Sequence, residues 1–502
     1  MYTPILFLII FPALFLYYKK KKSTPINWPV LGMLPGLLAH RNRIHDFITE
    51  CLQQNGGTFV FKGPWFGNMD MFYTCDPANI HYILSKNFQN FTKGSGFKKI
   101  LDILGDGIFM AEFESWEKQR KIAMSLFNQA GYQKFVGATI WRKVDSGLIS
   151  ILNHFSEMGM EVDLQELFQR FSFDCSCILI LGHDPASLHV DLPYMREEKA
   201  FADAEEAVLR RHLRPEWLWQ LEKWFQMGKE KKLSEAKKNL DLFISDCISL
   251  KSQKFKKMQH VLTDDENQDL DSLTSYMRLE LAEKDAPKIS EQTWKDTVLN
   301  LIFAGKDTIS AALTWLFWLL ATNPVEETKI RQEISTNLPA NDAGKRKFSD
   351  TDELKKLVYL HGALCETLRL FPPLGLQHKA PMEADTLPSG HQINPNTKTV
   401  LSFYSMGRME SIWGEDCLEF KPGRWITDQG RIKTEPSFKF TAFNGGPRSC
   451  IGKEMSFTQL KIAAASIISR FKFEIVENHP KSPSSSVVLL MKHGLKVKVS
   501  KI

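Results

Sequence analysis

The 502-residue sequence lacks the features that divide a long chain into separate units. Beyond about residue 40 it has no internal repeat and no Gly/Ser-rich or Pro-rich linker long enough to separate domains. Length alone would suggest about three domains. The missing linkers instead predict one catalytic domain over residues 40–502, with 43% hydrophobic and 24% charged residues, as in globular proteins.

The sequence also lacks a strong charge of one sign. The formal net charge is +6, of which Lys19–Lys22 supply four, leaving +2 for the rest of the chain. Proteins that bind nucleic acid carry a broad basic surface. We therefore expect no nucleic-acid partner.

Paired cysteines are missing as well. The eight cysteines form no CxxC pair, and no histidine cluster accompanies them at zinc-finger spacing. In so large a chain we expect most of them to be buried thiols in a reducing compartment. They are Cys51, Cys75, Cys175, Cys177, Cys247, Cys365, Cys417 and Cys450.

One long hydrophobic run is present at the amino terminus. Residues 2–18 are apolar apart from Thr3 and tyrosine hydroxyls, and Lys19–Lys22 follow at once. A secretory signal has the reverse order of basic and apolar segments. The run is at the short end of the roughly 17–25 residues that cross a bilayer, and the lysines favour the cytosolic side. Residues 1–22 are therefore predicted to be a single-pass membrane anchor, and residues 23–39, which are Pro-rich, a stiff hinge.

Helical periodicity dominates from about residue 40 to 370. Strands are predicted at 58–62 and 69–73, and a carboxy-terminal hairpin at 487–491 and 495–499. The clearest element is an apolar helix from Ser290 to Thr322, which Ser290 can cap and Pro324 ends. At about 1.5 Å per residue it would be roughly 50 Å long and run through the centre of the molecule. The predicted fold class is mainly α with small β-sheets.

A glycine-rich loop near the carboxy terminus contains Cys450, and a helical pattern follows it directly. The helix dipole and the nearby Arg448 favour a thiolate, which is the form of cysteine that binds metal. The plainer alternative is a glycine-rich turn with a buried cysteine. Phe443, Gly446, Arg448, Cys450 and Gly452 match the FxxGxRxCxG signature, so the chain resembles the cytochrome P450 superfamily.

That resemblance implies a fold in which a long central helix covers a haem and the cysteine loop lies beneath it. It implies haem b as cofactor, with Cys450 as the axial ligand to the iron. It also implies that Arg448 contacts a haem propionate, and that Phe443, Gly446 and Gly452 shape the loop that approaches the iron.

The predicted central helix contains Ala304-Gly305-Lys306-Asp307-Thr308. Buried polar side chains and a helical glycine are unfavourable unless they have a purpose. In the family this AGxDT segment lies over the distal haem face. There Gly305 would make room for dioxygen, and Asp307 and Thr308 would relay protons. The alternative is a helix kink in which Thr308 bonds back to the backbone. The family often has a second hydroxyl where this chain has Ile309, so whether Ser310 replaces it stays open.

Glu366 and Arg369 are three residues apart on a predicted helix and face the same side. Alone, such a pair is usually a surface contact of little energetic value. It matches the family's ExxR, which pairs with a later arginine, here Arg424 in a segment where Gly423 replaces the usual acid. The resemblance assigns Glu366, Arg369 and Arg424 a structural role behind the haem.

Trp116 and Arg120 match the family's WxxxR, whose side chains reach a haem propionate, and Lys379 falls where many members carry another propionate-binding arginine. Three further lysines would flank the proximal face and receive an acidic reductase, although each is singly explained as a solvated residue. They are Lys118, Lys121 and Lys453.

Similarity across the whole chain is to the plant fatty-acid and alkane hydroxylases, above all to the mid-chain alkane hydroxylases of cuticular wax synthesis. It rests on 27–36, 61–65 and 491–495. The implied substrate is a hydrophobic long-chain alkane, oxidised to an alcohol and after a second turnover to a ketone. Alternatives are a fatty-acid omega or in-chain hydroxylase, a hydroperoxide-rearranging enzyme, and a haem sensor or carrier.

The chain after Cys450 is too short for a fused flavin domain. Electrons from NADPH would therefore come through a separate NADPH–cytochrome P450 reductase, with cytochrome b5 as a further partner, at the endoplasmic reticulum membrane. Residues 209–225 alternate cations with Leu and Trp. This segment would contact membrane lipid, or form an ordinary amphipathic helix on the core.

Overall fold

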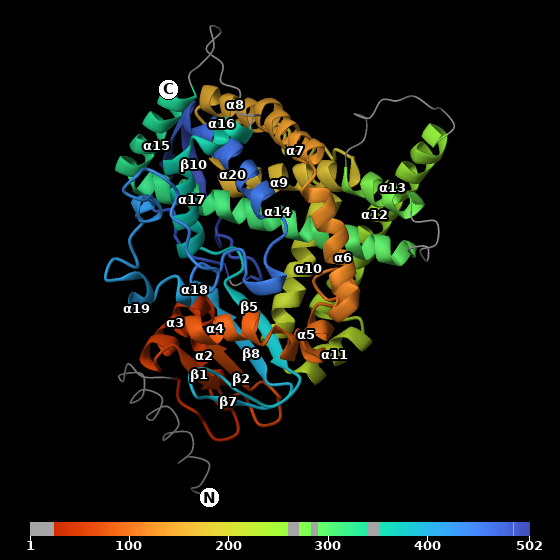
Figure 1. The fold of residues 1–502 in the computed structure, drawn as a ribbon, viewed down its shortest axis with the longest axis vertical. Helices are drawn as coiled ribbons and strands as arrows, with labels where there is room; N and C mark the ends of the chain where they lie inside the picture. The colour runs from red at the N-terminus through yellow and green to blue at the C-terminus, as the bar shows by residue number, and fades with distance from the viewer. Residues whose placement is uncertain (1–24, 260–270, 283–289, 339–350, 485) are drawn as a thin grey trace, which may run out of the picture.

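The computed structural model describes residues 25–259, 271–282, 290–338, 351–484 and 486–502 (Figure 1). The predicted membrane anchor, residues 1–22, lies outside these ranges. The described chain is mainly helical with small β-sheets, as the sequence predicts. Helices occupy much of the molecule, and the strands of the largest sheet gather at one end of it (Figure 1).

The helices before the central one are α2 (Leu34–Ala39), α3 (Ile44–Gln54), α4 (Pro77–His81), α5 (Ser95–Ile100), α6 (Phe113–Phe127), α7 (Ala130–Lys143), α8 (Ser150–Met158), α9 (Leu164–Leu181), α10 (Arg196–His212), α11 (Glu216–Trp224), α12 (Gly228–Gln259) and α13 (Ser272–Ala282). The central helix and those after it are α14 (Glu291–Thr322), α15 (Pro324–Asn337), α16 (Thr351–Lys355), α17 (Val358–Leu370), α18 (Phe403–Met406), α19 (Glu410–Trp413) and α20 (Lys453–Ile468).

The strands are β1 (Thr58–Phe61), β2 (Met71–Thr74), β3 (Phe91–Thr92), β4 (Glu161–Asp163), β5 (Leu376–Pro381), β6 (Asp385–Thr386), β7 (Gln392–Ile393), β8 (Lys398–Ser402), β9 (Phe471–Ile475) and β10 (Lys496–Lys501). They form a five-stranded sheet in the order β1-β2-β8-β5-β3, a three-stranded sheet in the order β4-β10-β9, and the pair β6-β7. The two predicted amino-terminal strands are confirmed as the antiparallel pair β1 and β2.

The predicted carboxy-terminal hairpin is wrong in one of its strands. β10 pairs with β9 and β4, whereas residues 487–491 form no strand and contribute only an isolated bridge between Met491 and Pro483. Val488, Leu489 and Met491 of this segment are buried, and the indole of Trp315 on α14 donates to the Leu489 carbonyl at 2.7 Å. Burial against a helix produces the same apolar pattern as a half-buried strand.

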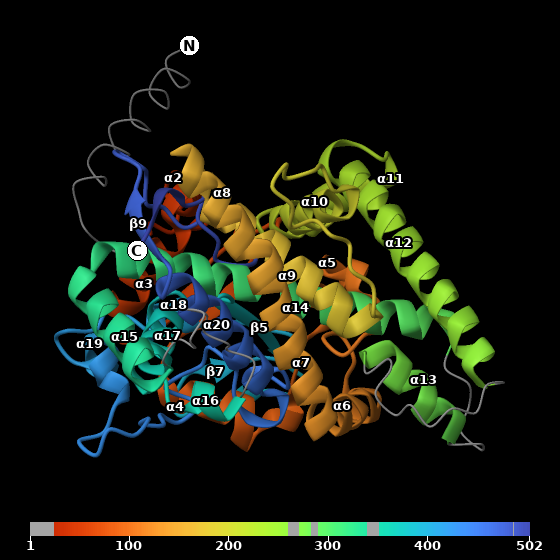
Figure 2. The ribbon, with the colours of Figure 1, turned by 90° about the horizontal axis from the view of Figure 1, so that it is seen from above.

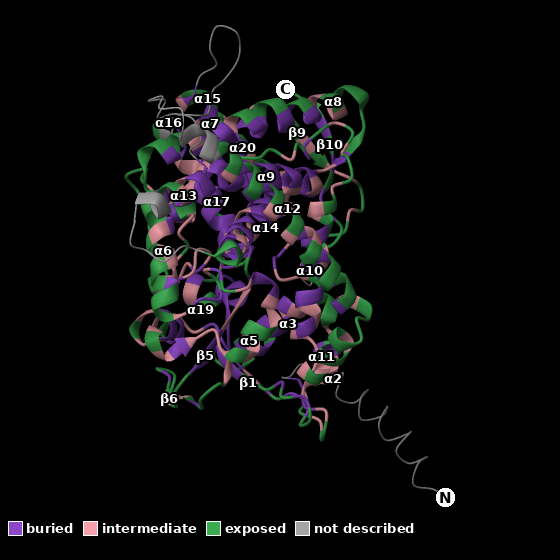
Figure 3. Ribbon diagram, turned by 90° about the vertical axis from the view of Figure 1, so that its right-hand side faces the viewer, coloured by how far each residue is buried: buried purple, intermediate pink, exposed green. Residues whose placement is uncertain are grey.

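The central helix forms as predicted. The Ser290 hydroxyl accepts a hydrogen bond from the backbone N–H of Thr293, and Pro324 begins the next helix after the break at Asn323. α14 packs along α9 and α17 and is buried over most of its length (Figure 3). In Figure 2, α10, α11 and α12 lie on the side of the molecule away from α15, α17 and α19.

The predicted hinge, residues 23–39, is described by the structure from residue 25 onward. Its described part is tied to the β1–β2 connection, because the backbone N–H of Met33 donates to the Lys62 carbonyl at 2.6 Å. It ends in the helix α2, which a proline-rich segment was not expected to form. Pro35 lies in the first turn of α2, where a missing N–H costs no helical hydrogen bond.

No single helix in the described ranges has the length and apolar composition of a membrane span. The bent pair α14 and α15, with 110° between its two parts, meets that criterion by length and composition alone.

Candidate active site

The loop before α20 presents Cys450. Its backbone N–H donates to the Phe443 carbonyl at 2.8 Å, which closes the loop on itself. Gly446 has a φ of +64°, and a Cβ there would lie 1.7 Å from the Leu84 carbonyl oxygen, so only glycine fits. Of the eight free cysteines, all within the described residues, Cys450 is the exposed one.

Cys450 is exposed as a residue, but much of the protein lies around its thiol. Desolvation by the surrounding protein raises its pKa, whereas a hydrogen bond from Gly452 and the charges of Arg120 and Lys453 act to lower it. The sequence pointed to Arg448 as the cation favouring the thiolate. The structure shows that Arg120 and Lys453 have this effect, because Arg448 turns to Glu112 and the Ala111 carbonyl.

Cations predicted to hold haem propionates gather beside this loop. The Arg448 guanidinium lies 4.6 Å from the ring of Trp116, and Arg120 donates to the Ser449 carbonyl at 2.8 Å. Lys379 is 1% exposed, donates to the Phe91 carbonyl at 3.0 Å, and has its pKa held well below the usual value by burial, Lys93 and Arg448.

These residues fit a bound haem. The buried Nε of Arg448 has no hydrogen-bond partner among the described residues. Lys93, Lys379 and Arg448 repel one another, and among the described groups Glu112 is the carboxylate that offsets them. An anionic group such as a propionate would complete such a cluster. On the adjacent loop, the accessible thiol of Cys450 would bind the haem iron.

The central helix opens one face toward accessible space. From Val298 to Phe317 every residue of α14 is buried except Phe303, Ala304, Gly305 and Thr308, which are half-buried. The Thr308 hydroxyl donates to the Ala304 carbonyl at 2.6 Å, which is the backbone bond that the alternative interpretation expected. That bond leaves the lone pairs of the hydroxyl oxygen free to accept.

Gly305 has a packing function that the sequence did not indicate. A Cβ at this position would lie 2.7 Å from the Ser176 hydroxyl of α9, so glycine permits the close approach of α9 to α14. Ser310 is fully buried and donates to the Asp307 carbonyl at 3.1 Å. It therefore does not lie on the half-buried face with Thr308.

Asp307 points away from water. It is 1% exposed, and its Oδ1 accepts from the Lys306 ammonium at 2.6 Å and from the Gln169 amide at 3.5 Å. Lys306, itself 2% exposed, was given no role from the sequence. The pair is therefore a buried salt bridge on the central helix.

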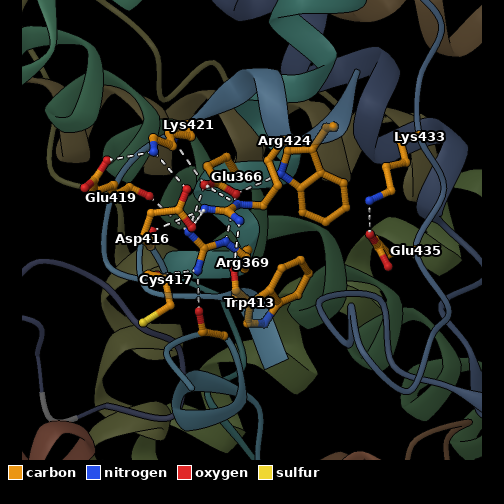
Figure 4. Close-up of polar contacts among 12 residues, drawn as sticks. Glu366, Arg369, Trp413, Asp416, Cys417, Glu419, Lys421, Arg424, Lys433 and Glu435 are labelled. Carbon is orange, nitrogen blue, oxygen red and sulfur yellow. Dashed lines mark hydrogen bonds and ion pairs between the residues drawn. The ribbon is translucent and has the colours of Figure 1, made fainter. Parts of the chain in front are cut away.

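The ExxR residues meet in a buried network (Figure 4). Arg369 forms a bidentate pair with Glu366, with bonds of 2.7 and 2.8 Å, and both side chains are fully buried. Arg424 adds a contact to Glu366 at 3.3 Å, and the Trp425 indole donates to the same carboxylate at 2.8 Å. The structure thus brings the three predicted residues together around one carboxylate.

The departure at Gly423 leaves this network intact. A Cβ at Gly423 would have no neighbour within 4 Å, so the missing side chain removes no packing. Arg424 finds its second carboxylate in Asp416, at 2.7 Å. Arg369 also donates to three backbone carbonyls, which fixes the segment around Cys417 against α17.

A cavity of about 220 Å³ lies between the β1–β2 connection, α5, α11 and β8. Three of the cations on its wall are paired: Lys99 with Glu216, Arg211 with Asp102 and Glu230, and Arg214 with Glu222. Lys398 donates to the backbone carbonyl of Asn68 instead of a carboxylate. The rings of His212 and His378 lie in the same wall, with centroids 5.1 Å apart and planes tilted by 38°.

Sequence reasoning missed this cavity, and it missed Glu112, Lys93 and Glu205. Each acts through a partner more than fifteen residues away, so no local spacing signals it. The lysines expected to receive a reductase, Lys118, Lys121 and Lys453, are all exposed, and Lys118 pairs with Glu114 at 2.8 Å.

Comparison with known proteins agrees with this arrangement. A sequence profile of the family described as cytochrome P450 matches residues 23–499. Alkane hydroxylase MAH1 of Arabidopsis thaliana is 42% identical over 99% of the chain and 98% of that protein. Noroxomaritidine synthase 2 of Narcissus pseudonarcissus is 39% identical over 96% of the chain and 92% of that protein. Cytochrome P450 86B1 of Arabidopsis thaliana is 39% identical over 95% and 86%.

Proposed function

The chain belongs to the cytochrome P450 family, and from that premise we propose that this monooxygenase inserts oxygen into a C–H bond of a long-chain alkane. The observation that carries the choice of substrate is the 42% identity, over nearly the whole chain, to a protein named alkane hydroxylase. The balanced reaction is R–H + O₂ + 2e⁻ + 2H⁺ → R–OH + H₂O.

The cofactor is a thiolate-ligated haem, which supplies the activation of dioxygen when bound. We assign Cys450 as its ligand. Arg448, Trp116, Arg120 and Lys379 would hold the propionates, since they gather on one side of the cysteine loop. Phe443, Gly446 and Gly452 would shape the loop itself.

Proton delivery is assigned to the half-buried face of α14. The oxygen of Thr308 can accept a hydrogen bond there and pass a proton on, while Asp307 lies one residue away in the buried interior. Gly305 completes this face. A haem sensor or carrier would have no use for a threonine and a buried carboxylate at these positions.

The substrate assignment is tested by turnover. We expect the purified full chain, with NADPH and its reductase in lipid vesicles, to convert long-chain alkanes to secondary alcohols. Omitting NADPH or reductase should abolish the product. Product from a fatty hydroperoxide without NADPH would instead indicate a rearranging enzyme, and ligand binding with no product from any substrate would indicate a sensor.

One observation favours fatty acids as a second class of substrate. Lys398, His212 and His378 line the cavity beside the β1–β2 connection, and burial lowers the pKa of His212 to about 4. Each neutral imidazole still has one N–H to donate. A carboxylate head group would find a cation and two donors at this wall, which an alkane cannot use.

Lys398→Gln should therefore weaken the binding of a long-chain fatty acid about tenfold, because one charge-assisted hydrogen bond is lost. Alkane binding should not change. Lys62→Gln removes the neighbouring lysine that pairs with Asp70 at the surface, and serves as the matched control. Equal fatty-acid affinity in the Lys398 variant, measured by spectral titration, would eliminate the second class.

We also propose that the chain is held at the endoplasmic reticulum membrane by residues 1–22 and leans on it through α11. Trp217, Leu221 and Trp224 are exposed on α11, while Trp219 turns inward onto Arg211 at 4.5 Å. Trp65 and Phe66 are exposed on the β1–β2 connection, across the cavity from α11. An ordinary amphipathic helix would bury most of its large apolar side chains, whereas α11 buries Trp219 and leaves its two other tryptophans and Leu221 exposed.

In vesicles of bromine-labelled phospholipid we expect quenching of tryptophan fluorescence in the full chain. Replacing both Trp217 and Trp224 by phenylalanine should reduce the quenched amplitude, because interfacial indoles lie next to the label. Trp141→Phe on α7 is the control and should keep it. An unchanged quenched amplitude in the α11 variant would place α11 away from the lipid.

Electrons are proposed to come from NADPH–cytochrome P450 reductase, with cytochrome b5 as an additional donor. Lys121 and Lys453 are exposed near the cysteine loop and would meet acidic groups of the partner.

A further inference from the structure

The buried carboxylate of Asp307 is only half satisfied. Its Oδ1 accepts from Lys306 and Gln169, whereas its Oδ2 has no hydrogen-bond donor among the described residues. A buried carboxylate oxygen without a donor is destabilising, because the hydration that it loses on burial is not replaced. A neighbouring carboxylic acid in its neutral form could donate to this oxygen.

Glu205 of α10 is that neighbour. Its helix packs on α14, since the rings of Phe201 and Phe303 are 4.9 Å apart and the Lys306 ammonium lies 5.7 Å from the Phe201 ring. The Glu205 carboxyl is in hydrogen-bonding contact with the carboxylate of Asp307. Two carboxyl groups in such contact cannot both be ionised, so they share a proton.

The electrostatics place this proton on Glu205. Burial, and then the Asp307 charge, raise the pKa of Glu205 well above its usual value. Burial opposes ionisation of Asp307 too, but the Lys306 charge and the hydrogen bonds from Glu205, Lys306 and Gln169 hold the pKa of Asp307 below its usual value. These effects favour a neutral Glu205 beside an ionised Asp307.

We propose that Glu205 is a positioning residue for Asp307: its protonated carboxyl donates to Asp307 Oδ2 and holds the proton that Asp307 passes toward the distal haem face. This inference rests on the proposed role of Asp307 in proton delivery. It adds to the AGxDT segment an acid from a different helix, which that motif does not specify.

The transfer balances within the cluster. The O–H bond of Glu205 breaks as an O–H bond forms at Asp307 Oδ2, which leaves Glu205 as the carboxylate. Glu205 is half-buried whereas Asp307 is 1% exposed, so Glu205 is the member that reaches accessible space and can take a proton from water. Lys306 remains charged throughout and neutralises whichever acid is ionised.

Other titratable groups surround the cluster. Glu198, on the same helix as Glu205, has its pKa raised by burial, while the charges of Lys306 and Arg170 lower it. Arg170 is itself paired with Glu166 at 2.9 Å. Glu206, next to Glu205, is exposed and pairs with Lys229. None of these other acids hydrogen-bonds to Asp307 within the part of the chain that the structure describes, so the Asp307 contact distinguishes Glu205.

The Glu205→Gln variant distinguishes two roles of Glu205: donating a hydrogen bond to Asp307 and holding a proton that can be transferred. The amide keeps the shape and can still donate to Asp307 Oδ2, but it has no acidic proton to transfer. We expect this variant to fold and to keep the carbon monoxide spectrum of the wild type. Glu206→Gln, which removes the adjacent surface carboxylate, is the matched control.

The first readout is independent of turnover. Infrared spectra of the resting protein at neutral pH should show the C=O stretch of a protonated carboxylic acid, which moves on transfer to ²H₂O. The Glu205→Gln spectrum should lose this band, and the Glu206→Gln spectrum should retain it. If the band is equally strong in the Glu205 variant, Glu205 is ionised and the proposal is wrong.

The second readout is the yield of product per NADPH consumed. Proton-transfer groups contribute factors of about 10² to 10⁴, and a group acting through another should contribute less, so Glu205→Gln should lower the yield about tenfold. In an Asp307→Asn background the same change should have no further effect, since the two act in series. Full yield in Glu205→Gln contradicts the proposal, whereas full yield in Asp307→Asn contradicts the role of Asp307 itself.

Discussion

We expect Glu366→Ala to leave little or no folded haem protein. The substitution removes a fully buried carboxylate that receives hydrogen bonds from Arg369, Arg424 and the Trp425 indole. Breaking a buried ion pair by removing one partner costs about 3–5 kcal/mol, because the remaining charge stays buried and unpaired. A folded protein is stable by only about 5–15 kcal/mol in total, so this loss is a large share.

The matched control is Glu50→Ala. Glu50 forms the same bidentate contact with an arginine, Arg43, at 2.6 and 3.2 Å, but both side chains are nearly half exposed. An exposed pair is worth about 1 kcal/mol or less. Thermal unfolding and the yield of haem-loaded protein should therefore fall sharply in the Glu366 variant alone. Equal behaviour of the two variants would show that the ExxR network is not required for the fold.

The sequence predicts the parts of the site whose residues are close together along the chain. The Cys450 loop, the AGxDT segment and the pair of Glu366 with Arg369 each occupy ten residues or fewer, and backbone geometry alone puts their members side by side. The central helix could be predicted in the same way, because the Ser290 cap and Pro324 are local signals in the sequence.

The other contacts of the site could not be predicted, because they depend on which helices and loops pack together. Glu205 meets Asp307 because α10 crosses α14, and Glu112 meets Arg448 because α6 begins beside the cysteine loop. Nothing within either segment indicates these partners. The incorrect prediction of a strand at residues 487–491 has the same cause. The apolar pattern of this segment indicates that it is buried, but not whether it pairs with a strand or packs on a helix.

Cys450→His is the second change with a large expected effect. Histidine offers a neutral nitrogen where a haem monooxygenase needs a thiolate, whose negative charge favours cleavage of the O–O bond. No other cysteine can take its place, because the remaining seven are buried. Burial raises the pKa of Cys51, Cys75 and Cys365 each to about 12, so these thiols stay protonated. Oxygenation of substrate should be abolished even where haem is retained.

The most direct test of the account is the carbon monoxide difference spectrum of the reduced protein. The wild type should show the red-shifted band of a haem with a thiolate ligand, and Cys417→Ser, at a buried cysteine, should show it too. Cys450→His should lose the band completely while still binding haem. A thiolate band that survives in the Cys450→His protein would contradict the assignment of Cys450 as the ligand, and with it the site described around this residue.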